Sequence, residues 1–480
     1  MKNRLFTISK VAFVAFALLC SQACKEDYDM VDPPLMTDYD DDLDEEVMLQ
    51  EGLENYFVTP YGEGTLDGSS WENAMDLAAF RTLLTGTTDL SKSTVYMSQG
   101  KYLMADESGM GMILRKDIKA IKGGYSQFSE GTDVSDRDVE NYITVFSGDV
   151  NANKKADAGD CSLLVIKKGH IVMEGITLQY GYAAADITTY NSGIYMDGAV
   201  NNTIIELHDC VIRDCVSAIT NSTAQGGPAI YNLSGQARLN RVKVLDNHAE
   251  SRGGALRCQS DNAIIMLNAC LLKGNSLAGM WGAGLQLSIG HTCINNTTMT
   301  DNVDASRSTT LNGGGSFLLT NNTFVGNGGN TNMGVFRCET KAGGGTKFIN
   351  NVFVSENSAM WSVNGSNLDV TSMGYNVYQV ASNITMNETD AQCGDFSFAT
   401  FSEDGTYHWD IASVSALTAY ATRQSVVDVA KSFNPEKSPI ANLGQVFVEW
   451  VGEEAFAVDQ RGQQRNPDKM QPGAYDAGLN

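Results

Sequence analysis

The chain has 480 residues, of which 57 are acidic and 33 basic, so its formal net charge is −24. This excess of acid excludes a generally basic nucleic-acid binder, because neutralising phosphates requires clustered Lys and Arg. There are 47 glycines and only 8 prolines. That composition favours many tight turns over a collagen-like or proline-rich disordered chain. Five histidines leave little material for a histidine-rich metal site.

Residues 1–23 predict a lipoprotein signal peptide. Three basic residues among the first ten precede the nine apolar residues 11–19, a run too short to span a membrane as a mature helix. The segment Ser21–Cys24 resembles a bacterial lipobox, in which the cysteine is lipidated and becomes the new N-terminus. The alternative is an ordinary signal peptide with a chance cysteine. We expect lipidation at Cys24, with outer-membrane lipid as the partner.

Residues 24–54 predict a disordered acidic tether. Thirteen Asp or Glu and one Lys lie between residues 25 and 54, which is about half of the net negative charge. Such a segment repels itself and cannot bury a core. The start Lys25–Asp27 resembles the acidic export signal of surface lipoproteins in some Gram-negative bacteria, and a plain solvated linker is equally open. The expected location is the cell outer membrane, facing outside.

A repeat dominates the middle of the chain. Seven segments carry an apolar residue at offset 0 and again at offset 5. The offset-0 residues are Met173, Leu207, Leu239, Leu267, Ile294, Leu319 and Ile349, and the offset-5 residues are Leu178, Ile212, Val244, Leu272, Met299, Phe324 and Val354. Offset 8 is Gly, Cys or, in five segments, Asn. We interpret each segment as a strand that runs into a turn in which Asn takes the left-handed conformation.

These segments predict an all-β fold, a right-handed parallel β-helix built as a single-stranded solenoid. Most repeats add a glycine-rich run followed by alternating residues, as at Gly253–Cys258, so each coil holds two or three short strands. Stacking the coils makes offset 5 an inward aliphatic ladder and lets the offset-8 Asn side chains hydrogen-bond along the axis. A helical solenoid is the alternative, which paired glycines and abundant Asn and Thr disfavour.

The remaining segments complete the predicted organisation. Leu77, Phe80 and Leu83–Leu84 predict a short amphipathic helix that caps the open end of the solenoid. We therefore divide the chain into a cap with the first coils (55–130), the β-helix core (131–380) and the C-terminal coils with a closing segment (381–480). No Cys-x-x-Cys pair occurs, so we interpret most cysteines as small buried hydrophobes and not as zinc ligands or disulfides.

Motifs at both ends resemble a known family. The residues are Asp67–Ala74, Gln99–Tyr102, Lys122–Tyr125, Phe146–Asp149, Gly374–Asn376, Lys437–Ile440 with Gly444, Asp459–Gly462 with Arg465, and Gly473–Asp476. They are similar to secreted right-handed β-helix proteins of the choice-of-anchor Q type. The resemblance covers most of residues 62–476 and implies a pectate-lyase-like fold. That fold also occurs in adhesins, so the resemblance is much less specific for activity.

Catalytic residues are hard to find in the repeat. A β-helix lyase or hydrolase needs acids, and for a lyase a basic residue, gathered on adjacent coils. None of the outward offsets 1, 2 and 6 stacks acidic residues. His208, Asp209 and Arg213 are the nearest approach to a cluster, and a solvated surface is the better interpretation of them. No catalytic residue is therefore predicted.

One loop has the spacing of a calcium site. Its oxygen-bearing residues occupy positions 1, 3, 5, 9 and 12 of a twelve-residue stretch: Asp149, Asn151, Asn153, Asp157 and Asp160. Lys154 stands where such loops need glycine, and the last residue is Asp instead of Glu. A plain acidic loop is the alternative. Calcium is the one cofactor considered, and otherwise none is expected.

A possible glycan-binding surface follows the glycine-rich runs. Four strand residues each lie one place beyond an apolar residue and are expected to point outward: Tyr195, Tyr231, Arg257 and Arg337. The fifth member of the set is Trp281, which lies near a glycine-rich turn. Aromatic faces with Arg donors suit sugar rings, although an ordinary mixed surface has the same composition. The sequence thus predicts a surface lipoprotein that binds glycans without catalysis. The alternative is a polysaccharide lyase or glycoside hydrolase on the same scaffold.

Overall fold

The computed structural model describes residues 52–105, 111–185, 192–220, 226–251, 253–279, 283–287, 289–304, 311–313, 315–325, 336–339, 345–354, 361–364, 370–379, 384–393, 398–399, 408–409, 417 and 419–476. All of them belong to one compact unit, residues 47–480. The signal peptide, Cys24 and nearly all of the tether lie outside the described residues. The boundaries proposed at residues 130 and 380 stay predictions.

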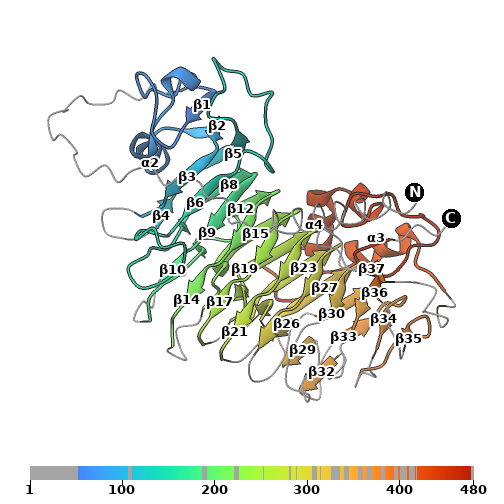
Figure 1. Cartoon of the computed structure of the whole chain (residues 1–480). Coiled ribbons are helices and arrows are strands. Elements are labelled where there is room, and N and C mark those ends of the chain that lie inside the picture. Colours follow the sequence, from blue (N-terminus) through green and yellow to red (C-terminus); the bar gives the residue numbers. More distant parts are fainter. Residues whose placement is uncertain are drawn as a thin grey trace, which may run out of the picture. The chain divides into compact units, whose positions relative to one another are not determined.

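Parallel strands build the body of the molecule, coil upon coil (Figure 1). Sheet 1 has the order β1 (Asn55–Val58), β2 (Leu90–Ser98), β5 (Ile118–Tyr125), β8 (Gly169–Glu174), β12 (Thr203–His208), β15 (Ile230–Asn240), β19 (Ala263–Asn268), β23 (His291–Asn295), β27 (Ser316–Thr320), β30 (Thr346–Ile349), β33 (Val370–Ser372).

Sheet 2 follows sheet 1 in each coil. Its strands are β3 (Gly100–Leu103), β6 (Thr144–Ser147), β9 (Ile176–Gln179), β13 (Val211–Arg213), β16 (Lys243–Leu245), β20 (Leu271–Lys273), β24 (Thr298–Thr300), β28 (Thr323–Val325), β31 (Val352–Phe353), β34 (Val377–Tyr378) and β35 (Ala391–Gln392). Sheet 3 is short and comes next: β10 (Tyr182–Ala183), β14 (Val216–Ser217), β17 (His248–Ala249), β21 (Ser276–Leu277) and β25 (Val303–Asp304).

Sheet 4 closes the coil and leads back to sheet 1. It contains β4 (Met112–Leu114), β7 (Leu164–Ile166), β11 (Ile194–Asp197), the first residues of β15, β18 (Leu256–Cys258), β22 (Leu285–Leu287), β26 (Leu311–Gly313), β29 (Phe336–Glu339) and β32 (Trp361–Asn364). Two further strands, β36 (Phe398–Ala399) and β37 (His408–Trp409), pair antiparallel. Successive parallel strands around one interior are a parallel β-helix, so the predicted fold class is confirmed.

The interior is the predicted apolar ladder, with one correction to its register. Offset-5 residues from Leu178 to Phe324 pair coil to coil and are buried. In the last repeat Leu319 pairs with Phe348, so this repeat begins one residue earlier than predicted. The inward residue is then Phe353, whose ring stacks on Phe324 with centroids 5.0 Å apart, and Val354 lies in a separate small cluster. Phe348 and Ile349 are both apolar, and so are Phe353 and Val354. Hydrophobicity alone therefore does not show which residue of each pair faces the interior.

The left-handed turns lie elsewhere than predicted. The offset-2 residues from Asp209 to Asn350 have φ between 50° and 59°, and at offset 7 residues such as Asp214 and Asp246 do the same. The offset-8 Asn residues that the structure describes, Asn247, Asn275 and Asn302, are instead buried and point inward. Asn247, Asn275 and Asn302 form a ladder in which each side-chain amide donates to the next Asn Oδ1, at 3.0 and 2.8 Å. The predicted stacking along the axis is thus confirmed, and the predicted turn conformation at offset 8 is wrong.

A second buried Asn ladder replaces the Cys and Val residues of offset 3 in the last coils. Asn322 donates to Asn351 and Asn351 to Asn376, each at 3.0 Å. The Oδ1 atoms of these residues also accept from backbone N–H groups of the preceding coil. Each amide therefore satisfies buried donors and acceptors at once, which holds adjacent coils in a single register.

Helices cover the solenoid at its first end and on one side. The short η1 (Trp71–Asn73) precedes α2 (Leu77–Thr85), which starts with Asp76 accepting from the Ala79 N–H and buries Phe80, Leu83 and Leu84 in the main core, as predicted. Near the C-terminus the chain forms α3 (Arg423–Lys431), α4 (Leu443–Val451) and η3 (Glu453–Phe456). The expectation of further coils therefore does not hold for residues 423–456. Among the described residues, no helix is long and apolar enough to cross a membrane.

Candidate functional site

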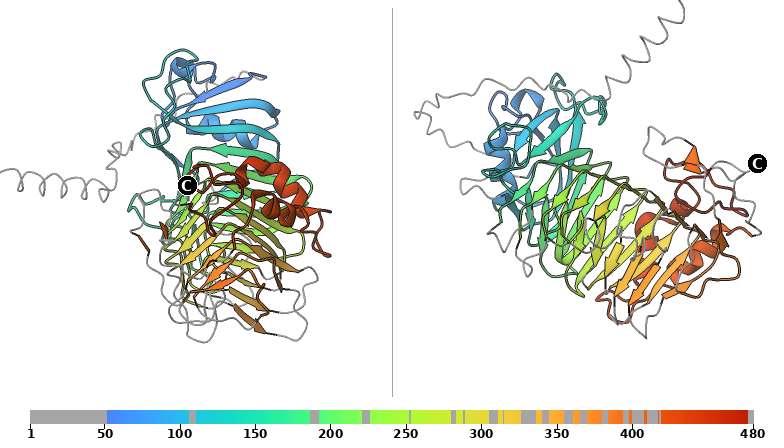
Figure 2. Two further views of the ribbon diagram at one scale, coloured as in Figure 1. Left: turned by 90° about the vertical axis from the view of Figure 1, so that its right-hand side faces the viewer. Right: turned by 60° about the horizontal axis from the view of Figure 1, so that its bottom comes forward.

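The outward face of sheet 1 changes character along the solenoid. On β1, β2 and β5 it carries the aromatic residues Phe57, Tyr96 and Tyr125, which pack with Trp71. From β19 to β30 it carries apolar residues, which are Ile264, Met266, Cys293, Leu318 and Ile349. These pack under α3, α4 and η3, which lie in red against the side of the stack in Figure 2. Between the two covered parts, the outward residues of β8, β12 and β15 are mostly polar, and the apolar exceptions are Val172 and Ile204.

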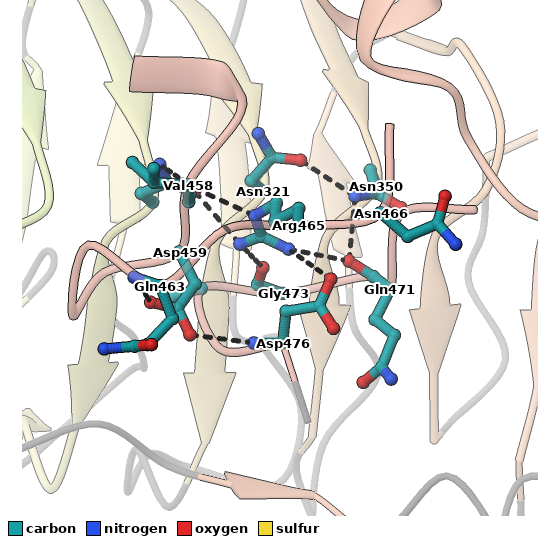
Figure 3. Close-up of polar contacts among 12 residues, drawn as sticks. Asn321, Asn350, Val458, Asp459, Gln463, Arg465, Asn466, Gln471, Gly473 and Asp476 are labelled. Atoms are coloured by element: carbon teal, nitrogen blue, oxygen red, sulfur yellow. Dashed lines mark hydrogen bonds and ion pairs between the residues drawn. The ribbon is translucent and has the colours of Figure 1, made fainter. Parts of the chain in front are cut away.

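A buried arginine fastens the covering segment. Arg465 donates to the carbonyls of Val458, Gln471 and Gly473 at 3.0, 3.0 and 2.7 Å (Figure 3). It also donates to Asn296 Oδ1, which belongs to the left-handed turn row, at 3.1 Å. Burial lowers the pKa of Arg465 to about 10. Since a buried guanidinium is costly unless its donors are used, this network fixes the closing segment against the coils.

The open polar face centres on Glu206 of β12. Its carboxylate lies 2.9 Å from Arg238 Nη1 on β15, 3.1 Å from His170 Nε2 on β8 and 3.5 Å from His208 Nε2 on its own strand. Partial burial alone would raise the pKa of Glu206. Hydrogen bonds from the two histidines and the charge of Arg238 outweigh that effect and hold the pKa well below its usual range. Glu206 is therefore a fixed anion at neutral pH.

Two further ion pairs flank this centre. Glu174 at the end of β8 contacts Lys122 at 3.1 Å and Arg137 at 3.8 Å. On the adjoining turns Arg241 binds the Asp209 carboxylate through two nitrogens, at 2.6 and 2.7 Å, and this bond raises the pKa of Arg241. We call the side chains of these two pairs and of the Glu206 centre the open polar face, comprising Lys122, Arg137, His170, Glu174, Glu206, His208, Asp209, Arg238 and Arg241.

Sequence reasoning found only part of this face. It grouped His208, Asp209 and Arg213, of which the first two belong to the face. Arg213 lies on sheet 2, where it donates to Gln179 Oε1. The comparison of offsets 1, 2 and 6 in the repeat did not include the positions of His170 and Glu206, so the sequence did not reveal these two residues. Alternation within Thr203–His208 would have shown that Glu206 shares the outward side with His208.

The predicted glycan column lies on sheet 4 and is largely covered. Tyr195, Tyr231 and Arg257 pair in register, with the two rings stacked 5.6 Å apart and the guanidinium 5.7 Å from the Tyr231 ring. An outward direction does not leave two of them accessible, since Tyr195 is 7% exposed and Arg257 is 0% exposed. The Arg257 side chain fits because residue 253 is glycine. A Cβ at Gly253 would lie 2.5 Å from Arg257 Nη1. Sugar binding by this column stays a prediction.

Two members of that set cannot be placed. Trp281 lies outside the described residues, and of Arg337 only the position in β29, paired with Asn312, is described.

The predicted calcium loop satisfies its own carboxylates. Asp149 accepts from Lys101 Nζ and from the Asn153 and Lys154 N–H groups, all within 3.1 Å. Asp157 accepts from the Asn151 and Asn153 amides, and Asp160 accepts from the Val150 and Asp157 N–H groups. In the part of the chain that the structure describes, no group of three His, Cys, Asp or Glu is placed to hold a metal. A calcium ion would have to displace these bonds.

The cysteines behave as buried apolar residues. Seven of them, Cys161, Cys210, Cys215, Cys258, Cys270, Cys293 and Cys393, are described, and all are buried with free thiols. Burial raises the pKa of Cys210, Cys215 and Cys270 to about 12, so these thiols are poor nucleophiles. The interpretation of these cysteines as small hydrophobes is confirmed for the described positions.

Comparisons with known proteins found a similar solved structure and leave the activity open. No family model and no curated protein matches the chain. Among solved structures, the crystal structure of pectate lyase Pel9A is similar, with a TM-score of 0.36 and 12% identity over 72% of this chain and 80% of that one. The strand pairings of the chain itself make it a parallel β-helix protein. At this level of similarity the neighbour says nothing about what the chain binds or whether it is an enzyme.

Proposed function

We propose that the mature chain is a lipid-anchored protein of the cell outer membrane, facing outside, whose β-helix binds polysaccharide on the open polar face. The predicted signal peptide, the lipobox at Cys24 and the acidic tether support the anchored location. A rigid solenoid on an extended tether suits display at a distance from the membrane.

The observation that carries the binding proposal is the network around Glu206. It holds carboxylate acceptors beside guanidinium and imidazole groups in fixed positions, and a sugar hydroxyl both donates and accepts hydrogen bonds. Side chains that are already ordered by one another lose little entropy when a ligand binds. The exposed large apolar residues among those described, which are Tyr61, Phe128, Val150, Ile289 and Val303, all lie outside β8, β12 and β15. The outward apolar side chains on these strands, Val172 and Ile204, are half-buried, so an apolar partner has little to pack against there.

The state of Glu206 favours binding over hydrolysis. A glycoside hydrolase needs a carboxylic acid that stays protonated near neutral pH, beside a second carboxylate. The pKa of Glu206 is lowered instead of raised, and Glu174 is held by two cations. Neither acid is arranged as a proton donor.

A lyase is the second candidate, and the two histidines favour it. His170 is 47% exposed at its side chain, so its imidazole is accessible as a general base. Lys122 and Arg137 would neutralise the carboxylate of a uronic acid, which β-elimination requires. The lyase candidate requires that the protein cleave a polysaccharide, whereas the binding proposal requires no reaction.

Binding is tested with a panel of neutral and acidic polysaccharides and titration calorimetry. Replacing His208 and Lys122 by Ala in one variant should weaken the binding of the recognised polysaccharide about tenfold or more, which corresponds to about 1.4 kcal/mol. Arg213→Ala on sheet 2 is the matched control and should leave the affinity unchanged. Equal affinity of all three proteins would refute binding at this face. Unsaturated products formed by the wild type and lost in His170→Ala would establish the lyase instead.

The anchor is tested separately. Cys24→Ala should move the protein from the membrane fraction to the soluble fraction, because the acyl chains supply the membrane affinity. A protein that stays with the membrane after this substitution is held there by something other than lipidation.

A further inference from the structure

A serine, a histidine and a glutamate lie in line on sheet 3, which is separated from the open polar face by sheets 2 and 4. Ser276 Oγ on β21 is 2.8 Å from His248 Nδ1 on the neighbouring strand β17. The other ring nitrogen, Nε2, is 3.3 Å from Glu250 Oε1. From this arrangement we propose that Ser276 is a nucleophile that takes acyl groups from small carboxylic esters, with His248 as its base and Glu250 orienting the ring.

The strand geometry fixes the three groups relative to one another. His248 and Ser276 are direct register partners in adjacent parallel strands, so their side chains emerge on the same side. Glu250 follows His248 by two positions, and alternation places it on that side as well. The His248 side chain is 32% exposed and that of Glu250 is 46% exposed, so an ester in solution can reach them.

This constellation occurs at one level of the solenoid. The outward row of sheet 3 is otherwise Tyr182, Val216 and Val303. Val216 separates the Tyr182 hydroxyl from His248, and Val303 has no polar side-chain atom, so among the described strands of sheet 3 the trio is not a repeated packing device. An exposed pair of this kind also contributes little to stability, because water competes for the same hydrogen bonds.

The chemistry follows from the contacts. Ser276 Oγ attacks the ester carbonyl carbon while its proton passes to His248 Nδ1, and the alkoxy group leaves as an alcohol by taking that proton from the ring. Water then attacks the acyl-serine, again giving its proton to His248, and releases the carboxylic acid and free Ser276. Imidazole can serve in this way through either nitrogen, provided that the other one holds a proton that Glu250 accepts in a hydrogen bond.

The backbone around Ser276 restricts the substrate class. The N–H groups of Ser276 and Ala278 both donate to carbonyls of the preceding coil, at 2.9 Å, and so are not free to stabilise an oxyanion. Amides need that stabilisation most, because their leaving group is poor. The geometry therefore fits O-acyl esters and not peptide bonds.

The test uses the full chain with p-nitrophenyl acetate and a fluorophosphonate probe. We expect a burst of nitrophenol, and phosphonylation that peptide mapping assigns to Ser276. The exposed Ser91, which lies on β2, is the internal comparison and should be labelled about 100-fold more slowly, the usual scale of general-base assistance. His248→Gln should remove most of the labelling, and Glu250→Gln a smaller part.

Folding is checked independently of reactivity. Ser276→Ala removes one half-buried hydroxyl from the outer side of β21, so its circular dichroism and thermal midpoint should match the wild type while the burst disappears. Labelling of Ser276 no faster than of Ser91, or labelling that survives His248→Gln in a folded protein, would overturn the proposal. Polysaccharide binding at the open polar face should be the same in all these variants, so the two proposals fail or succeed separately.

Discussion

Glu206 shows how a single residue couples charge to stability at the open polar face. Its folded pKa lies below its ordinary value of 4.5 because two histidines and Arg238 stabilise the anion. The stabilisation is therefore fully present above the unfolded pKa and is lost as the pH falls through the folded pKa. Glu206→Gln should cost about 1–3 kcal/mol of unfolding free energy at pH 7, and the difference from wild type should shrink below about pH 4.

Denaturant unfolding of both proteins at pH 7 and pH 3 measures this effect. Glu250→Gln is a fitting control, since the Glu250 side chain is far more exposed than that of Glu206 and its carboxylate pairs with His248. A difference between Glu206→Gln and wild type that stays constant down to pH 3 would mean that the charge of Glu206 does not contribute.

Arg465 illustrates a buried charge that acts through hydrogen bonds. Its three nitrogens are distributed over three carbonyls and the Asn296 amide, and the Asp476 carboxylate is 3.9 Å away. Arg465→Ala should cost about 3–5 kcal/mol, because it removes the donor of these four buried hydrogen bonds and the cation beside Asp476. Arg465→Lys keeps the charge but not the planar fork, so it should recover only part of the loss. Urea unfolding followed by tryptophan fluorescence checks both, and two wild-type-like midpoints would contradict the argument.

At the scale of elements, the repeat in the sequence predicted the coils correctly. It did not predict features at positions where several residue types occur, such as the left-handed turns and the second Asn ladder. The offset-5 ladder and the cap helix α2 followed directly from apolar spacing. The turns did not, because Arg241 and Ala269 occupy left-handed positions that their side chains do not favour. Offset 3 holds Ile, Cys, Val or Thr in the earlier coils and Asn only in the last ones, so the repeat did not predict the second Asn ladder. The helices α3 and α4 were missed, although the spacing of Leu443, Phe447 and Val448 predicts an amphipathic helix.

The corrected register of the last repeat makes a quantitative prediction about β31. Phe353 fills the interior against Phe324 and Phe348, so Phe353→Ala should cost about 3–5 kcal/mol. Val354 packs in the small separate cluster, and Val354→Ala should cost about 1–2 kcal/mol, a smaller loss because fewer methyl groups are removed. Thermal and denaturant unfolding of the two variants decides the register. A larger loss for Val354→Ala would restore the frame that the sequence repeat suggested.

At the scale of the molecule, the open polar face depended on tertiary contacts that no repeat encodes. The three strands that carry it resemble their neighbours in sequence pattern. They differ in what lies over them, since the aromatic cluster covers one neighbour and the C-terminal helices the other. Residues about 160 positions apart make this difference, as when Asn296 donates to Ala455 and Val458. Spacing within a coil carries no information about such contacts, which is why Glu206 and His170 went unnoticed.

The same arrangement predicts how the molecule responds when the closing segment is removed. Cys293 points outward from sheet 1 and is buried under the C-terminal helices, whereas Cys270 belongs to the interior of the solenoid. A chain that ends after Thr418 should therefore expose Cys293 together with Ile264, Met266 and Leu318, and should self-associate through this apolar surface. Under native conditions a thiol reagent should modify Cys293 in the shortened chain and leave Cys270 unmodified, as peptide mapping can show. In the full chain both should resist. Modification of Cys270 as readily as Cys293 would mean that the helices hold the coils themselves together, and do not merely cover one side of them.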